Sequence, residues 1–298
     1  MRVAILSARQ GGGWHTEQLC RALADRGHEG RVLPYEALTA SFGGGRGAPG
    51  FAAAGEDLAS CAAVLARIVP AGSLEQIIFR VDMLHALEER GVPVINSPRA
   101  IERTVDKLWT TAILERAGLP VPETVVCESP DAAVAAFRAL GDVIVKPLFG
   151  SMGLGMVRVS DEEMAFRVFR TLETLRGVYY LQRAIDHAGC DVRAFVVGGR
   201  VIGAIERSAP PPGWKTNIAR GGRARAVTLE PERAGLALAA ARAVEADYAG
   251  VDLLPARDGT VYVVEVNGIP GWRGLQEASS IDVAAAIVEH LLERATPR

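Results

Sequence analysis

The hydrophobic and polar positions in the first third of the chain form short apolar runs that alternate with amphipathic stretches. Residues 3–6 have the pattern of a buried strand, residues 15–26 have helical spacing, and a second strand is expected near residues 31–33. Alternating strands and helices indicate a small parallel α/β domain, which we assign to residues 1–97.

The remainder of this domain has a less regular pattern. Residues 39–55 are rich in glycine, alanine and serine and are expected to form a long surface loop. Residues 77–81 are typical of a strand, residues 83–90 of a short helix, and residues 92–95 of another strand. A polar cap followed by proline then predicts a helix over residues 98–117.

Residues 98–184 are expected to form a second lobe that contains a glycine-rich loop. A strand ends on Lys146 and is followed by the run FGSMGLGM, a further strand and a helix with a capping box at Ser160. The lysine precedes the glycines and no helix follows them directly, so this is not a Walker A loop. Lys146 is either a solvated lysine or a phosphate ligand. Glycines at Gly150, Gly153 and Gly155 leave backbone N–H groups free to approach phosphate, and the expected nucleotide contacts in this loop are Gly150, Ser151, Met152 and Gly153.

Residues 185–298 are expected to form a third lobe with two hairpins, the second turning at Asp258-Gly259. A two-residue turn there would place Asp252 opposite Glu265, with Asn267 on the same face as Glu265. Directly opposed carboxylates destabilise a ladder unless their charge is offset. These oxygen donors suit Mg²⁺ or Mn²⁺ better than zinc, so the hairpin predicts a metal site. The alternative is a solvated acidic face, which the surrounding valines disfavour.

Composition and charge narrow the function further. The 298 residues include 33 Lys and Arg and 35 Asp and Glu, and the net charge of -2 gives no basis for nucleic-acid binding. No run approaches the ~18 apolar residues of a membrane span, and the N-terminal apolar run is too short for a signal peptide. Four scattered cysteines without metal spacing are typical of a cytoplasmic protein. The sequence is compatible with either a monomer or a homo-oligomer.

Several short motifs follow one another in a specific order along nearly the whole chain: Asp106-Lys107, Val145-Lys146 with the glycine run, GCDVR at 189–193, AIER at 204–207, NIARGG at 217–222, AGVD at 249–252, and EVN at 265–267 before Pro270-Gly271. With this set the chain resembles the RimK-type α-L-glutamate ligases of the ATP-grasp superfamily. The resemblance implies an α/β (α+β) ATP-grasp fold, in which a small N-terminal domain precedes two lobes that clamp ATP and two Mg²⁺ or Mn²⁺ ions.

The resemblance also implies roles for individual residues. Lys107 and Lys146 would bind the ATP phosphates, and residues 182–185 would form a hinge that holds adenine through its backbone. Many relatives have Glu and an aromatic residue where this hinge has Arg183 and Ala184. The other implied nucleotide contacts are Gln182, Arg183, Ile185 and Asp191, and the implied metal ligands are Asp252, Glu265 and Asn267. The implied contacts to the acyl phosphate and the amino acid are Arg193, Arg207, Asn217 and Arg220.

The implied reaction joins L-glutamate to an acceptor carboxylate through an acyl phosphate. Residues 70–76 and 79–82 resemble the branch that acts on small C1-carrier cofactors of the tetrahydromethanopterin or methanofuran type. The alternative acceptors are the C-terminus of a ribosomal protein and an amino-group carrier protein. Outside the ligases, the alternatives are a non-catalytic ATP-binding regulatory module and a redox enzyme, although the dinucleotide fingerprint after the first strand is missing.

Overall fold

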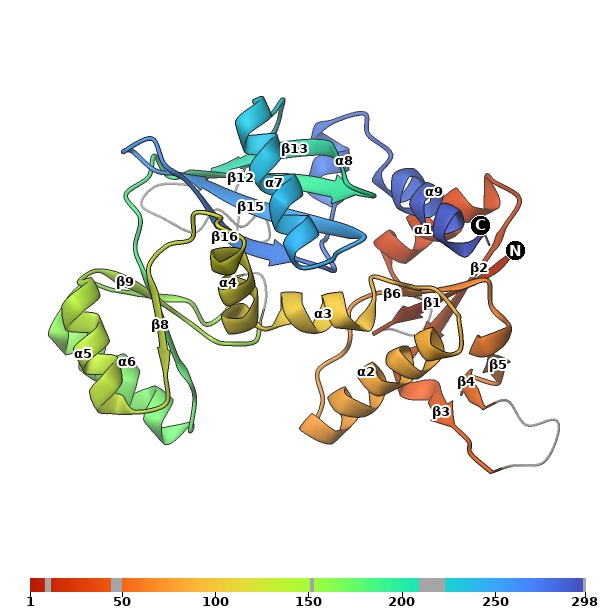
Figure 1. Cartoon of the computed structure of the whole chain (residues 1–298), viewed down its shortest axis with the longest axis horizontal. Helices are drawn as coiled ribbons and strands as arrows, with labels where there is room; N and C mark the ends of the chain where they lie inside the picture. The colour runs from red at the N-terminus through yellow and green to blue at the C-terminus, as the bar shows by residue number, and fades with distance from the viewer. Residues whose placement is uncertain (9–11, 44–49, 151–152, 209–222, 297–298) are drawn as a thin grey trace.

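The computed structural model describes residues 1–8, 12–43, 50–150, 153–208 and 223–296 (Figure 1). The N-terminal unit contains the parallel sheet that the alternating pattern predicted; its strand order is β2-β1-β6-β7, and the strand at residues 63–66 was not among those expected. Its strands are β1 (Arg2–Ser7), β2 (Glu29–Pro34), β6 (Ala63–Ala66) and β7 (Val94–Ile95). Its helices are α1 (Trp14–Ala24) and α2 (Leu74–Glu89).

Two predictions in this unit were wrong. The strand expected at residues 77–81 lies inside α2, whose first turn is fixed by a capping box between Ser73 and Gln76. The loop expected at residues 39–55 contains two strands of a small sheet, where the buried side chain of Phe51 gives one of them an apolar anchor. That sheet consists of β3 (Leu38–Ala40), β4 (Phe51–Ala53) and β5 (Glu56–Asp57), with short 3₁₀ turns at Tyr35–Ala37 and Leu58–Ser60.

The central sheet is antiparallel, in the order β10-β9-β11-β8. It is formed by β8 (Thr124–Cys127), β9 (Val143–Lys146), β10 (Val157–Val159) and β11 (Tyr179–Arg183). Helices α5 (Pro130–Leu140) and α6 (Glu162–Thr174) contribute to its core. The predicted cap of α6 was one residue early, because it is the Asp161 carboxylate, and not Ser160, that accepts from the Met164 N–H at 2.8 Å.

The C-terminal sheet is also antiparallel, in the order β14-β13-β12-β15-β16. Its strands are β12 (Cys190–Val197), β13 (Arg200–Ser208), β14 (Arg223–Val227), β15 (Tyr248–Pro255) and β16 (Val261–Asn267). Helices α7 (Pro231–Ala243), α8 (Arg273–Ala278) and α9 (Val283–Ala295) lie beside it. None of the helices that the structure describes combines the length and hydropathy needed to span a membrane.

The helix expected over residues 98–117 is interrupted at Asp106, giving α3 (Pro98–Val105) and α4 (Lys107–Arg116). Asp106 has an extended backbone, and its carboxylate caps the second helix by accepting from the Trp109 N–H at 3.1 Å. The interruption places Lys107 in the first turn of α4, next to the cavity described below.

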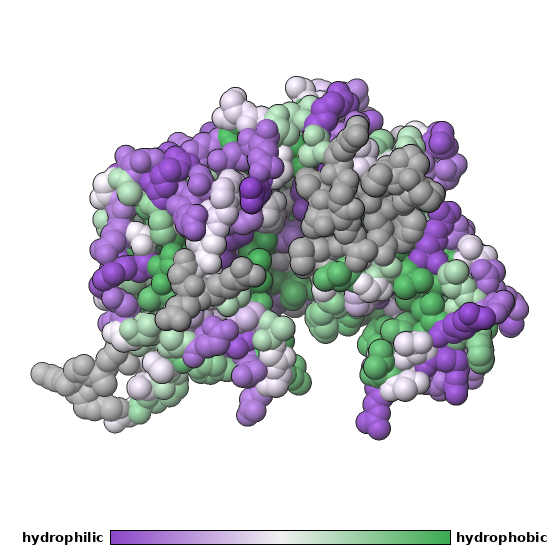
Figure 2. Space-filling view, turned by 180° about the vertical axis from the view of Figure 1, so that it is seen from behind, coloured by the Kyte–Doolittle hydropathy of each residue, from purple (hydrophilic) through white to green (hydrophobic). Residues whose placement is uncertain are grey.

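The N-terminal and C-terminal units share a core in which side chains of β1 and α1 pack with side chains of β12 and α9. The fully buried Asn96 links the same two units, since its amide donates to the Tyr248 carbonyl at 2.8 Å. Ile113 and Leu114 of α4 pack with the C-terminal sheet. The boundaries at residues 97 and 184 therefore stay a proposal. Figure 2 shows a hollow between the part that carries α2 and the part that carries α5 and α6.

Candidate active site

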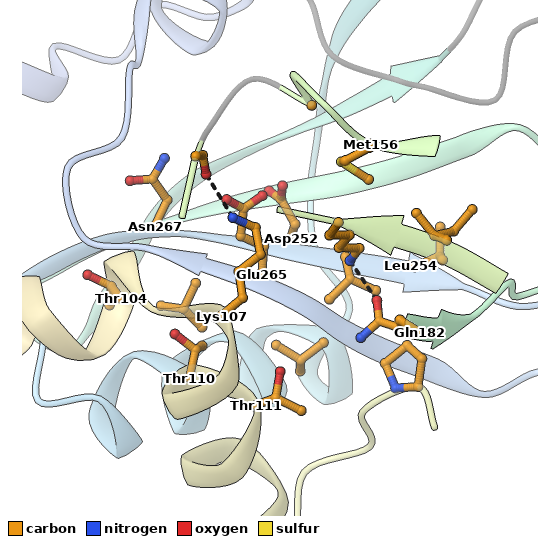
Figure 3. Close-up of a pocket in the computed structure, with 18 of the residues that line it drawn as sticks. Thr104, Lys107, Thr110, Thr111, Met156, Gln182, Asp252, Leu254, Glu265 and Asn267 are labelled. Carbon is orange, nitrogen blue, oxygen red and sulfur yellow. Dashed lines mark hydrogen bonds between the residues drawn. The ribbon is translucent and has the colours of Figure 1, made fainter. Parts of the chain in front are cut away.

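A cavity of about 380 Å³ lies where the central sheet, the C-terminal sheet and helices α3 and α4 meet (Figure 3). Lys107 and Lys146 both line it, although they come from different elements. The Lys107 ammonium donates to the carbonyls of Leu148 at 3.4 Å and Gly150 at 2.8 Å, so it contacts the start of the glycine-rich loop. The Lys146 ammonium donates to the side-chain oxygen of Gln182 at 2.6 Å.

Burial affects the acidity of both lysines. Burial lowers the pKa of Lys146 to about 8; the charge of Lys107 adds to this effect, while Glu265 and Asp252 oppose it. Burial also lowers the pKa of Lys107, and Glu265 and Asp106 oppose that shift. The buried ammonium of Lys146 and the half-buried ammonium of Lys107 have uncharged oxygens as hydrogen-bond partners, and together they form a site for an anion of high charge density, such as a polyphosphate.

The predicted pairing of Asp252 with Glu265 is confirmed, but the predicted turn is wrong. Pro255 pairs with Val261, so the turn is longer than two residues and closes through a hydrogen bond from the Ala256 N–H to the Thr260 carbonyl at 2.8 Å. A bulge next to Asp252 then shifts the ladder by one residue and restores the expected register. Figure 3 shows Asp252 and Glu265 directed toward the same part of the cavity as Lys107.

Two arginines on neighbouring strands offset the charge of Asp252. The Arg193 guanidinium binds both carboxylate oxygens, at 2.6 and 2.7 Å. Arg207 lies 2.8 Å from one of these oxygens and also donates twice to Asp191, at 2.7 and 2.6 Å. Sequence reasoning had expected a metal ion to offset the opposed carboxylates, and it missed this Arg–Asp network.

Burial and the neighbouring opposite charges together determine the pKa values of Asp252 and Arg207. Burial alone would raise the pKa of Asp252, but Arg193 and Arg207 outweigh burial and hold this pKa at about 2. Burial alone would lower the pKa of Arg207, yet Asp252 and Asp191 raise it above its ordinary value. Asp252 and Arg207 therefore remain charged near neutral pH, and their opposite charges offset each other within the protein.

The expected metal ligands fit a hard divalent cation in their chemistry. Glu265 and Asn267 line the cavity with oxygen atoms, although the Asn267 oxygen also accepts from the Ile269 N–H at 2.9 Å. Asp252 keeps little spare acceptor capacity beside its two arginines, so Glu265 is the principal donor. The described part of the chain holds no group of three or more His, Cys, Asp or Glu side chains suited to a metal ion, and this set has only two acids.

The structure also places the remaining predicted residues. Those that line the cavity are Gly150, Gly153, Gln182, Arg183, Ile185, Asp191 and Arg207. Arg193 reaches the site through Asp252. Ser151, Met152, Asn217 and Arg220 lie outside the described residues. Sequence reasoning missed the lining residues Thr104, Thr110, Thr111, Tyr180 and Leu254, which belong to ordinary helical and strand patterns that carry no signal of a site, and it missed Met156 at the end of the glycine-rich run.

This arrangement, with a nucleotide-sized cavity between two antiparallel sheets and a lysine on each side, defines a protein of the ATP-grasp class. The RimK-like ATP-grasp domain model matches residues 104–291, and the RimK PreATP-grasp domain model matches residues 1–101. The chain belongs to the RimK-like ATP-grasp family, as the sequence motifs predicted. It is an ATP-dependent ligase, and the fold implies that it binds ATP and Mg²⁺.

Two relatives illustrate the range of similarity. The tetrahydromethanopterin:α-L-glutamate ligase of Methanosarcina acetivorans is 40% identical over 256 residues, covering 77% of this chain and 79% of the relative. A probable α-L-glutamate ligase of Nitrosococcus oceani is 32% identical over 299 residues, covering 99% of this chain and 97% of the relative.

Solved structures support the fold along the whole chain. A RimK domain ATP-grasp protein from Sphaerobacter thermophilus superposes with a TM-score of 0.76 at 26% identity, covering 98% of this chain and 100% of that one. The ATP-grasp ligase PsnB, complexed with a precursor peptide and AMPPNP, superposes with a TM-score of 0.74 at 24% identity, covering 99% and 97%. The second likeness concerns the fold alone.

Proposed function

We propose that this chain is an α-L-glutamate ligase that adds L-glutamate to the tail of a small C1-carrier cofactor of the tetrahydromethanopterin or methanofuran type. The observation that carries the proposal is the joint presence of Lys107, Lys146 and Glu265 in one cavity of an ATP-grasp ligase. The acceptor is supported by the 40% identity to a tetrahydromethanopterin:α-L-glutamate ligase.

The cavity residues divide between the parts of the nucleotide. Lys107 and Lys146 bind the phosphates, and the apolar side chains of Ile185 and Leu254 provide surfaces for the flat adenine ring beside the hinge. Glu265 and Asn267 would hold Mg²⁺, and Asp252 would support them from the Arg–Asp network. When bound, Mg²⁺ supplies neutralisation of the phosphate charge during transfer.

The reaction proceeds in two steps. An oxygen of the acceptor carboxylate attacks the γ-phosphorus of ATP, the bond from that phosphorus to the bridging oxygen breaks, and ADP leaves with the electron pair. The amine of L-glutamate then attacks the acyl carbon of the mixed anhydride, phosphate leaves, and the nitrogen loses a proton to give the amide. The lysines would hold the phosphates in line, and Arg193, which is paired with Asp252, would stabilise the charge that develops on the acyl oxygens. We propose the same chemical role for Asn217 and Arg220 on the basis of the family motif alone.

The test is ADP release by the purified protein with L-glutamate and candidate acceptors, together with mass spectrometry of each acceptor for added glutamyl units. We expect ADP release only when both substrates are present. Glu265→Gln should lose most of this activity, whereas Glu173→Gln, on the exposed face of α6, should retain it.

The results separate the alternatives. Glutamyl units on a ribosomal protein C-terminus or on an amino-group carrier protein would replace the proposed acceptor but keep the ligase. ATP binding without turnover on any acceptor would contradict the ligase and indicate a regulatory module.

A further inference from the structure

The side chain of Gln182, and not only its backbone, belongs to the phosphate end of the cavity. Its Oε1 atom lies 2.6 Å from the Lys146 ammonium, and both side chains are buried on neighbouring strands of the central sheet. An ammonium group has only hydrogen-bond donors, so chemistry fixes the orientation of the amide: the oxygen must face Lys146. Figure 3 shows this contact.

The opposite end of the amide is held equally firmly. Its Nε2 atom donates to the hydroxyl oxygen of Thr124 at 3.0 Å and to that of Tyr180 at 3.3 Å. The Thr124 hydroxyl donates in turn to the Pro122 carbonyl at 2.8 Å, which leaves its oxygen free to accept from the amide. The Gln182 amide is therefore held at its oxygen by the Lys146 donor and at its nitrogen by two hydroxyl oxygens that can accept its protons.

The same network reaches the other lysine-bearing element. The Tyr180 hydroxyl lies 2.8 Å from the Thr111 hydroxyl, and Thr111 belongs to α4, the helix that begins with Lys107. A chain of hydrogen bonds thus connects the Lys146 ammonium, through Gln182 and Tyr180, to the helix that carries the second lysine. Movement of the central sheet relative to α4 would break this chain at the Tyr180–Thr111 contact.

The chemical identity of the Lys146 partner matters for ligand binding. A carboxylate at this position would form a buried ion pair and cancel the charge that a phosphate needs. An amide oxygen satisfies the ammonium without cancelling its charge. We propose that Gln182 is a positioning residue for Lys146, which aims the ammonium at the nucleotide phosphates and keeps its charge available to them. This inference rests on the proposed function only in taking ATP as the ligand of the cavity.

The test compares ATP with adenosine, a probe that lacks phosphates, by titration calorimetry on the full chain. We expect Gln182→Glu to weaken ATP binding about 30-fold, because the new carboxylate competes with phosphate for Lys146. Adenosine binding should change less than about twofold, since the backbone hinge is untouched. The matched control is Gln76→Glu, an identical change at an exposed capping-box position that accepts glutamate equally well.

A second pair of variants separates positioning from packing. Gln182→Met removes the oxygen but leaves the lysine charge intact, so it should weaken ATP binding less than Gln182→Glu. A packing role predicts the reverse order, because glutamate has the shape of glutamine. If either variant fails to fold, Tyr180→Phe deletes one anchor of the amide while keeping the ring, and should weaken ATP binding about threefold with adenosine unaffected.

The outcomes are distinct. Equal losses of ATP and adenosine would mean that the Gln182 amide recognises adenine, and unchanged ATP binding would mean that it does not hold Lys146 in the complex; either result overturns the inference. ATP binding that follows the expected order, with no ADP release on any acceptor, would overturn the proposed ligase and leave the inference standing.

Discussion

The two lysines and the two arginines of the active site lie close together but have different partners. Lys107 and Lys146 donate to uncharged oxygens, namely two backbone carbonyls and one amide. Arg193 and Arg207 donate to carboxylates, which they bind through two nitrogens each. The positive charge of the lysines therefore stays available to a ligand, whereas the carboxylates of the protein neutralise most of the charge of the arginines. The number of cations around a cavity does not reveal how much positive charge a substrate meets.

Because of this difference, the lysines and the arginines affect the stability of the fold in different ways. Lys146 is buried and Lys107 half-buried, and no carboxylate pairs with either; removal from water lowers the pKa of both groups and makes the empty site less stable. The arginines and aspartates stabilise one another, and each would be strongly destabilising alone. We thus expect loss of a lysine to affect ligand binding and loss of an arginine to affect folding.

The largest effect is expected for Arg207→Ala. This change leaves Asp191 and Asp252 buried without one of their cations, and we expect the free energy of unfolding to fall by about 3–5 kcal/mol, measured by urea denaturation. The control is Arg225→Ala on the adjacent strand, whose exposed side chain pairs with Glu206 at 3.0 Å and should contribute less than about 1 kcal/mol. Similar small losses in both variants would contradict the assignment of Arg207 to a structural network.

An intermediate effect is expected for Lys146→Met, which removes a buried charge and keeps the length of the side chain. The free energy of unfolding should stay the same or rise by about 1 kcal/mol, because no carboxylate loses its partner. ATP binding should weaken about 100-fold through loss of a charge-assisted contact. Urea denaturation and calorimetry measure the two quantities. A loss of stability as large as that expected for Arg207→Ala would contradict the proposed difference between the two lysines and the two arginines.

The smallest effect concerns pH. The pKa of Lys146 is lowered to about 8 by burial, with Lys107 adding to the shift and Glu265 and Asp252 opposing it, so the ammonium loses its proton as pH rises through 8. We expect ATP affinity to fall about tenfold between pH 7 and pH 9. The Lys146→Met variant should show a flatter profile over the same range, and an identical slope in both proteins would assign the titration to another group.

The sequence predicted the parts of the fold in which local pattern and packing agree. The central strands and the hairpin at residues 190–208 follow from alternation and from Gly198-Gly199. Residues 77–81 of α2 were mistaken for a strand because the run from Ile77 to Val81 is rich in β-branched residues, whereas the Ser73 cap that fixes the start of the helix is a single side chain. Local propensity was overruled by one hydrogen-bonded cap and by the buried face of the helix.

The candidate site was predicted as a set of residues but not as a set of contacts. Lys107, Lys146 and Glu265 lie in sequence motifs of the family, so the sequence alone was enough to name them. The structure brings all three to one cavity. The pairing of Arg193 with Asp252 joins residues 59 positions apart on different strands, which only the folded sheet places side by side. The bond between Gln182 and Lys146 depends in the same way on strand register.

The bulge beside Asp252 divides the hairpin into two parts with different registers. The outer rungs, from Leu253 to Pro255 opposite Val261 to Val263, belong with the turn, whereas Asp252 and Glu265 lie on the far side of the irregularity. Rebuilding the turn at residues 256–260 should leave the spacing of the carboxylates unchanged. That turn is therefore a suitable position for a fluorescent label that reports nucleotide binding from outside the cavity.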